Sequence, residues 1–376
     1  MTVKKKPPLR AILFSLSFAL SVYAQGPGIE QQLQQQQQQL PVYMRVQGVP
    51  QLVGPVAQSK DETEALIGLQ KEQSANKRIE LADAFVAKYP GSDFVQEAHT
   101  FRVYAYVQLG KTKESIAAAE QAIDTTIKFR DKLIAKADTD AKLTALEKED
   151  IKKKDKDAVF LVKNSPQFIT FVRQSEQRIL GFYQTIIQGY QQLNDPAKVM
   201  ESGERVIRFK PDEISTLMMV SNALAERPPA NEQEKTRQMQ RAEQLANQAL
   251  SLLPGFMATE GARIPEEFRG ETPAQMHYTL GLIYFHQKKL GSSQQEFLTA
   301  IKSRSKHPET YYRLGMAYEQ DKKEDQAMEA LGKSVFLKGT SEAEARAMLE
   351  KLYVRKNKSA DGLEDYVKAC GAKIGQ

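Results

Sequence analysis

A motif that recurs after 34 residues constrains the fold of this chain more than any other feature of its sequence. The two copies read His277-x-x-Leu280-Gly281-x-x-Tyr284 and Tyr311-x-x-Leu314-Gly315-x-x-Tyr318. Residues three and four apart share one face of an α-helix, so each copy predicts a helix with a buried face. A repeat of this length is typical of helical-hairpin arrays, in which neighbouring units complete one another's core. From about residue 60 onward the periodicity is helical, and no segment alternates as a strand would.

Small residues at fixed places in the repeat have a physical role. Gly281 and Gly315 let the two helices of a pair approach where a side chain would clash. The small residues Ser293 and Ala327 open the second helices and fit the space opposite. The sequence therefore predicts closely packed helix pairs in this region.

The second helix of each unit follows the same pattern. Its positions are Ser293, Phe297 and Ala300 in one copy and Ala327, Leu331 and Ser334 in the next. The two units resemble the tetratricopeptide family residue by residue, except that His277 and Tyr311 stand where the family usually has tryptophan. The resemblance implies an all-α solenoid of tetratricopeptide-type helical hairpins whose first helices line a concave groove.

Diverged copies of the pattern precede the clear ones. Their second-helix positions are Ala242, Ala246, Ala249 and Pro254 in one copy, Val199, Gly203, Val206 and Pro211 in another, and Ser115, Ala119 and Ala122 in the earliest. The turn Tyr89-Pro90-Gly91-Ser92 is similar to the repeats of bacterial envelope proteins, such as the outer-membrane assembly lipoproteins and the Tol-Pal coordinator. The chain departs from the lipoproteins because no cysteine near its N-terminus could receive a lipid.

Residues 1–24 resemble a bacterial secretory signal. Its positive residues are Lys4, Lys5, Lys6 and Arg10. The apolar stretch 11–22 is shorter than the roughly 20 residues of a transmembrane helix, and Ala24 ends a small-residue cleavage site. We therefore expect cleavage before Gln25 and a periplasmic or secreted protein without a membrane span.

The remaining segments differ in character. Residues 25–59 contain a glutamine tract and several prolines, which predicts a disordered tether. Residues 124–164 are rich in Lys and Asp, which predicts an elongated solvated helix pair or a partly mobile insertion. The expected organisation is a signal peptide at 1–24, the tether at 25–59, an N-terminal tetratricopeptide-like unit at 60–123, a charged helical insertion at 124–179, diverged repeats at 180–254, a loop at 255–273, two clear repeats at 274–341 and capping helices at 342–376.

The charge of the chain does not favour nucleic acid as a partner. The formal net charge is +6, and loss of the four cations of the signal leaves 6 − 4 = +2. Binding to nucleic acid needs a basic face or stripe, which such a balanced chain does not predict. The single cysteine, Cys370, excludes an intramolecular disulfide.

Motifs for catalysis and for metal or cofactor binding are missing from the sequence. Its four histidines are His99, His277, His286 and His307, and no two have the spacing of a metal-binding pair. No Gly-x-Ser-x-Gly elbow or phosphate-binding loop occurs. We expect no enzyme activity, no cofactor and no metal. The alternative left open is an enzyme of the cell wall or of secreted polymers, with its catalytic unit in 124–273.

The family resemblance also indicates where a partner would bind. The inward positions of the family correspond here to Tyr278, Leu282, Phe285, His286, Tyr312, Arg313, Met316 and Glu319, and in the last unit to Arg346 and Tyr353. Aromatic residues and arginine are common interface anchors, but an aromatic stripe also suits a core, so both interpretations stay open for Phe285 and Tyr312. The Lys and Asn residues with which some members clamp a terminal carboxylate are absent from these positions.

Together these features predict a scaffold in the bacterial cell envelope that binds another exported or membrane-associated protein in its groove. A second alternative is a self-assembling structural solenoid, which would form oligomers without a foreign partner.

Overall fold

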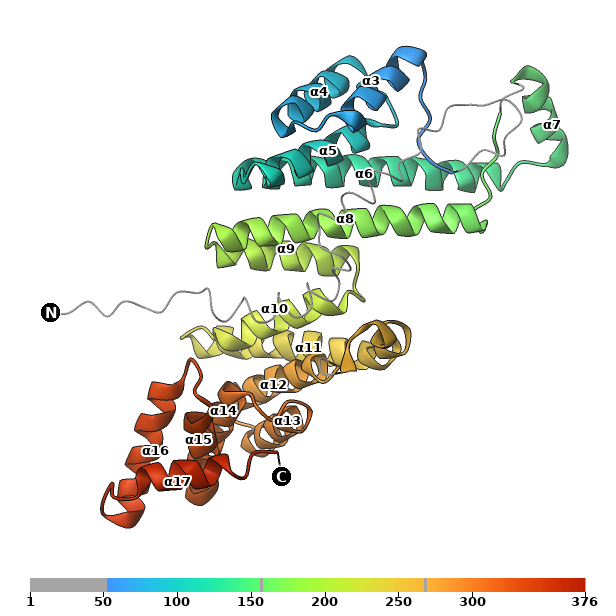
Figure 1. Ribbon diagram of the computed structural model, residues 1–376. Coiled ribbons are helices and arrows are strands. Elements are labelled where there is room, and N and C mark those ends of the chain that lie inside the picture. The colour runs from blue at the N-terminus through green and yellow to red at the C-terminus, as the bar shows by residue number, and fades with distance from the viewer. Residues whose placement is uncertain (1–52, 156–157, 267–268, 376) are drawn as a thin grey trace. The chain divides into compact units, whose positions relative to one another are not determined.

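The computed structural model describes residues 53–155, 158–266 and 269–375. Within these ranges it contains fifteen α-helices, α3 to α17, with one short 3-10 helix and no strand (Figure 1). The prediction of an all-α fold of paired helices is confirmed. None of the described helices is both long enough and apolar enough to cross a membrane. The signal-like segment and most of the glutamine-rich segment lie outside the described residues.

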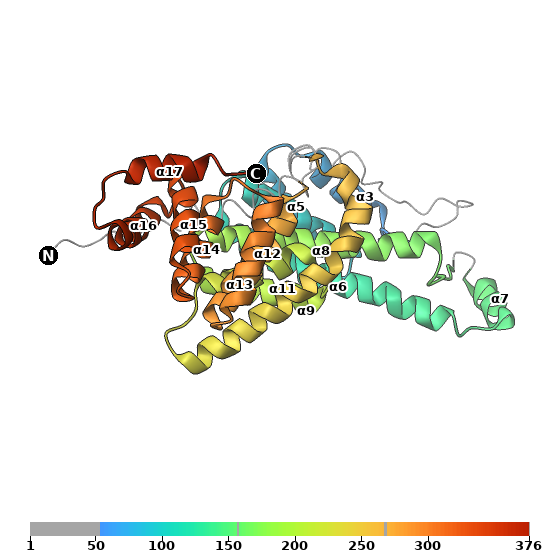
Figure 2. The ribbon, with the colours of Figure 1, turned by 90° about the horizontal axis from the view of Figure 1, so that it is seen from below.

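The described residues up to Ser202 belong to one compact unit, which we call the N-terminal unit. Its helices are α3 (Lys60–Lys71), α4 (Ala75–Lys88), α5 (Val95–Gln108), α6 (Thr112–Asp140), α7 (Ala145–Lys154), α8 (Pro166–Gln192) and the first part of α9 (Pro196–Phe209). Leu66, Phe85 and Phe101 are buried together where α3, α4 and α5 meet. The long helices α6 and α8 lie side by side in both views (Figures 1 and 2).

The residues from Gly203 onward form the second unit, which we call the C-terminal unit. Beyond the end of α9, its elements are α10 (Ile214–Glu226), α11 (Glu232–Glu260), η1 (Gly261–Arg263), α12 (Glu271–His286), α13 (Leu290–Ser303), α14 (Pro308–Gln320), α15 (Glu324–Leu337), α16 (Glu342–Asn357) and α17 (Leu363–Gly371). Consecutive helices pack as pairs, α10 with α11, α12 with α13 and α14 with α15, and α16 and α17 pack against α15. Among the first helices, α12 also packs against both α10 and α14. We call α10, α12, α14 and α16 the A helices.

The repeat glycines lie where the helices of a pair are closest. A Cβ atom on Gly281 would lie 2.6 Å from the ring of Phe297, and one on Gly315 would lie 2.7 Å from Leu331 Cγ. Ser293 opens the facing helix, and its hydroxyl donates a hydrogen bond to the Gly281 carbonyl at 2.8 Å. The predicted role of these small residues is therefore confirmed.

Four helix pairs end their first helix with the same turn. The backbone N–H groups of Lys111, Asp195, Lys289 and Lys323 donate to the carbonyls of Tyr106, Tyr190, Tyr284 and Tyr318, at 3.0, 2.9, 2.9 and 2.9 Å. The residues just before these donors, Gly110, Asn194, Lys288 and Lys322, have positive φ. This is the Schellman arrangement, in which a left-handed residue closes a helix. The shared turn relates the ends of α5 and α8 to those of α12 and α14 in the two clear repeats.

The left-handed residue of this turn gives a prediction about stability. Lys322 has φ of 60° and an exposed side chain, and the left-handed conformation costs a residue with a Cβ atom about 1 kcal/mol. Lys322→Gly should therefore raise the free energy of unfolding by up to about 1 kcal/mol. Gly110→Ala, which meets no atom within 4 Å, should lower it by a similar amount. Urea denaturation measures the free energy of unfolding of both variants. A change of the same sign in the two variants would contradict the explanation.

Two expected domain boundaries fall inside continuous helices. The limits at 123/124 and 179/180 lie within α6 and α8, so neither limit coincides with the end of a helix. The reason is that the buried stripe of α6 continues through Phe129 to Ala137, and the Phe129 ring meets that of Phe171 in α8 edge-on at 5.6 Å. The two helices are elongated, and α7 between them has no buried residue.

The expected loop at 255–273 is shorter than the sequence suggested. Helix α11 continues through Pro254 to Glu260, and α12 begins at Glu271. Proline removes one backbone donor, but a helix can continue with a local distortion where its side chains still pack. Leu253 is buried and Phe256 and Met257 are half-buried, so the apolar stripe persists beyond the proline.

Candidate partner-binding face

The A helices of the C-terminal unit present equivalent residues at intervals of 34. Stripes with spacings of four and three residues contain Tyr278, Leu282 and Phe285 on α12, Tyr312, Met316 and Glu319 on α14, and Arg346, Glu350 and Tyr353 on α16. Residues with this spacing share one face of a helix. We call these nine residues, with His286 and Arg313 beside them, the A-helix face.

Two of the eight residues expected to contact a partner are core residues. Tyr278 is 6% exposed and Leu282 is 0% exposed. The Tyr278 ring lies between Phe297 and His307, with ring centroids 5.9 and 5.8 Å away. The expectation that these two side chains meet a partner is therefore corrected, because the neighbouring helices already cover them.

The other six expected contact residues are half-buried. They are Phe285, His286, Tyr312, Arg313, Met316 and Glu319. Phe285 and Tyr312 pack against the core of the C-terminal unit while part of each ring stays accessible. The core interpretation of these aromatic residues therefore holds in part, and their contact with a partner stays a prediction.

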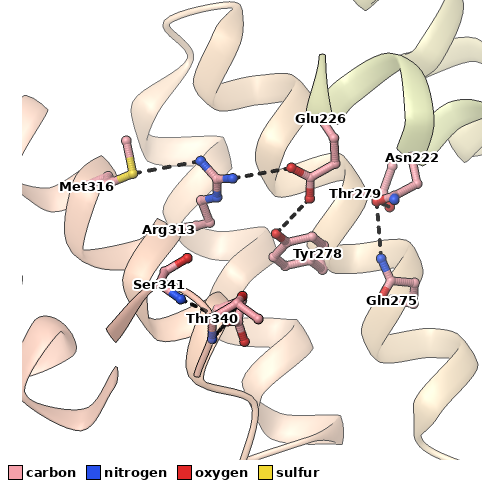
Figure 3. Close-up of polar contacts among 10 residues, drawn as sticks. Asn222, Glu226, Gln275, Tyr278, Thr279, Arg313, Met316, Thr340 and Ser341 are labelled. Carbon is pink, nitrogen blue, oxygen red and sulfur yellow. Dashed lines mark hydrogen bonds and ion pairs between the residues drawn. The ribbon is translucent and has the colours of Figure 1, made fainter. Parts of the chain in front are cut away.

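A polar network connects three A helices on this face (Figure 3). The carboxylate of Glu226, at the end of α10, accepts a hydrogen bond from the Tyr278 hydroxyl at 2.9 Å. Its other oxygen accepts one from Arg313 Nη2 of α14 at 3.2 Å. Arg313 also lies near Met316 Sδ at 3.9 Å and over the Tyr312 ring, 5.6 Å from its centroid. The guanidinium is therefore neutralised by a residue of its own chain.

Protonation states on this face follow from burial and neighbouring charge. Burial raises the pKa of Tyr278, and the Glu226 carboxylate raises it further, so the phenol stays a hydrogen-bond donor. Burial lowers the pKa of His286, and the cations Arg313 and Lys235 lower it further. His286 is thus neutral at neutral pH and adds no positive charge to the face.

The sequence did not single out α10 as a contributor to this face. Asn222 Oδ1 accepts hydrogen bonds from Gln275 Nε2 at 3.2 Å and from Thr279 Oγ1 at 3.1 Å, which ties α10 to α12. Glu226 and Asn222 lie on a helix with neither the glycine nor the tyrosine of the repeat. No motif in the sequence therefore indicated that these two residues face the A-helix face.

Among the described residues, no group of three or more His, Cys, Asp or Glu side chains could hold a metal ion.

Comparison with known families identifies the repeats. The tetratricopeptide repeat model matches residues 96–125, 274–307 and 308–338. The chain contains tetratricopeptide repeats. The second and third matched segments are the α12–α13 and α14–α15 pairs, and the first lies in α5 and α6. Tetratricopeptide repeats typically form scaffolds that bind other proteins. The matched repeats therefore indicate a scaffold for protein–protein interaction.

Solved structures with similar helices share little sequence with this chain. A thermophilic tetratricopeptide protein of Thermus thermophilus has 12% identity and a TM-score of 0.35, with 69% of this chain and 99% of that chain covered. BtubC from P. vanneervenii has 14% identity and a TM-score of 0.37, with 73% and 89% covered. The assembly chaperone of RpL4, Acl4, has 12% identity and a TM-score of 0.35, with 80% and 99% covered. No curated protein matches the sequence.

The network predicts a measurable coupling between α10 and α14. Arg313→Met would leave the Glu226 carboxylate, whose side chain is 15% exposed, with Tyr278 as its one remaining partner in the network. We expect a loss of about 2 kcal/mol in the free energy of unfolding, less than for a fully buried pair because Arg313 is partly solvated. The double variant Glu226→Gln/Arg313→Met should lose only about half as much free energy of unfolding as Arg313→Met, which urea denaturation measures. A loss in the double variant equal to the sum of the losses in the two single variants would contradict the coupling.

Proposed function

We propose that this protein is an exported scaffold of the bacterial cell envelope that binds a segment of another exported or membrane-associated protein on its A-helix face. The observation that carries the proposal is the pair of half-buried aromatic side chains, Phe285 and Tyr312, on neighbouring A helices. Each ring is anchored in the core and leaves part of its surface accessible. An aromatic side chain that core packing already fixes loses little conformational entropy on binding, and aromatic residues are frequent hot spots of interfaces.

The polar groups around these rings support a docking role. Arg313 is held by Glu226 and by the Tyr312 ring, so its position is set before any partner arrives. A side chain fixed in this way reduces the entropy lost on association. The apolar surfaces of Phe285 and Met316 lie on the same two helices and would supply the buried area.

The cellular setting in this proposal rests on the sequence of residues 1–24. A positive segment, a short apolar stretch and a small-residue cleavage site together favour export. N-terminal sequencing of the protein recovered from fractionated cells should give Gln25 as the first residue of an exported form. A cytoplasmic protein that retains Met1 or Thr2 would contradict the export part of the proposal.

The docking part of the proposal is tested by truncating the two rings. In the producing cells, Phe285→Ala/Tyr312→Ala should remove a partner that is reproducibly crosslinked to the unaltered protein. Leu298→Ala is the matched control, because Leu298 is an exposed apolar residue, 42% exposed, on the second helix α13. Thermal denaturation of both variants establishes that they fold. A full set of partners retained by the double variant would overturn docking on this face.

A further inference from the structure

Two carboxylates of the A-helix face lack an ion-pair partner among the described residues. They are Glu319 on α14 and Glu350 on α16. Glu350 is exposed, and Glu319 is half-buried. The uncompensated charge of this surface is therefore negative.

The cations of the same region are already paired. The pairs are Arg313 with Glu226 at 3.2 Å, Lys235 with Glu232 at 3.4 Å, and Arg346 with Glu364. His286 is kept neutral by burial and by its cationic neighbours. Lys351 is exposed on α16, but it follows Glu350 directly and so points about 100° away around the helix. An acidic partner would have to displace an existing carboxylate before it met a free cation here.

Aromatic rings add to the preference for positive charge. Phe285, Tyr312 and Tyr353 are half-buried residues of three successive A helices. The face of an aromatic ring carries negative potential and attracts lysine or arginine side chains, by about 0.5–1 kcal/mol at exposed sites. Tyr312 already attracts Arg313, with 5.6 Å between the guanidinium and the ring centroid.

We propose that the A-helix face recognises a basic segment of its partner, in which lysine or arginine residues alternate with apolar residues. This inference rests on the proposed docking function and specifies the chemistry of the occupant. The partner's cations would pair with Glu319 and Glu350, and its apolar side chains would cover Phe285 and Tyr312.

Synthetic peptides of defined charge provide the test. A fluorescent peptide that alternates lysine with alanine and leucine is titrated with the full chain, next to the same peptide with glutamate in place of each lysine. Fluorescence anisotropy should show binding of the basic peptide at least about tenfold tighter, and added salt should weaken it because exposed charges are screened.

Charge-reversal variants locate the binding to this face. Glu319→Lys/Glu350→Lys should weaken the basic peptide by at least about tenfold and strengthen the acidic one. Glu114→Lys/Glu266→Lys is the matched control, because it changes the net charge equally at exposed residues of α6 and of the loop after α11. This control should stay within about twofold of the unaltered protein, since exposed charges outside the A-helix face are screened.

Several outcomes would overturn the basic-segment inference. It fails if the acidic peptide binds equally well, if both double variants weaken the basic peptide alike, or if the basic peptide does not bind. An acidic natural partner that is lost in Phe285→Ala/Tyr312→Ala would refute this inference and leave the docking function standing. Absence of any partner crosslinked to this face would instead refute the docking function itself.

Discussion

Gly281→Val is expected to lower the free energy of unfolding of the C-terminal unit by about 3 kcal/mol. Even a Cβ atom at this position would lie 2.6 Å from two atoms of the Phe297 ring. That ring is 0% exposed, so it has no free space into which it can move. The helices α12 and α13 would have to separate, which would expose the apolar surface between them. Urea denaturation followed by circular dichroism measures the loss.

A control in the same helix pair isolates this clash from the general effect of replacing a glycine. Gly291 lies in α13, and a Cβ atom there would meet no atom within 4 Å. Gly291→Ala should leave stability unchanged or raise it by up to about 1 kcal/mol, since alanine favours a helix more than glycine does. Phe297→Leu in the Gly281→Val background should restore part of the loss by making room. Equal effects at positions 281 and 291 would refute the close-approach explanation.

Acid is expected to destabilise both units through buried neutral histidines. Burial is the main cause that lowers the pKa of His99 to about 4, with Arg102 adding to it. Burial likewise lowers the pKa of His307 to about 4, with Arg304 adding to it. His99 is 7% exposed and its Nδ1 has no hydrogen-bond partner among the described residues, whereas His307 Nδ1 lies 2.7 Å from Thr310 Oγ1.

The sign of this effect follows from proton binding. Between its ordinary pKa of 6.5 and its folded-state pKa of about 4, each histidine binds a proton in the unfolded chain but not in the folded one. The stabilisation is therefore complete above pH 6.5 and is lost as the pH falls towards 4. Each histidine lowers the free energy of unfolding by about 1.4 kcal/mol per pH unit in this range, and by about 3 kcal/mol in all.

Denaturation between pH 7 and 5 measures this dependence before most carboxylates titrate. His99→Leu should flatten the pH dependence of the N-terminal unit, and His307→Asn should flatten that of the C-terminal unit. Amide hydrogen exchange in α5 and α14 reads the two units separately. A pH dependence unchanged in both variants would contradict the assignment to these histidines.

The last two repeats could be located from the sequence because short motifs within each helix determine how it packs. Gly281 and Gly315 fix both the close approach and the register of α12 and α14, so these helices could be predicted from short motifs. The extent of α11 could not, because Pro254 is a strong local stop signal that the packing of the following residues overrides. The continuity of α6 and α8 was missed because charged exposed residues concealed their buried stripes.

The candidate face was predicted in part, for a related reason. Tyr278 and Tyr312 occupy the same repeat position, yet the first is buried and the second is half-buried. The difference depends on the helices beside each tyrosine, which the motif does not encode. The pairing of Glu226 with Arg313 joins residues 87 apart in sequence, so no local pattern could indicate it.

The most direct test of the central claim, that a partner docks on the A-helix face, is site-specific photocrosslinking in the producing cells. A photoreactive amino acid is introduced in place of Phe285 or Tyr312, and in place of Leu298 on α13 as the control. The docking account predicts that positions 285 and 312 crosslink to the same foreign protein and that position 298 does not. Equal crosslinking at all three positions, or crosslinks only between copies of this chain, would contradict it.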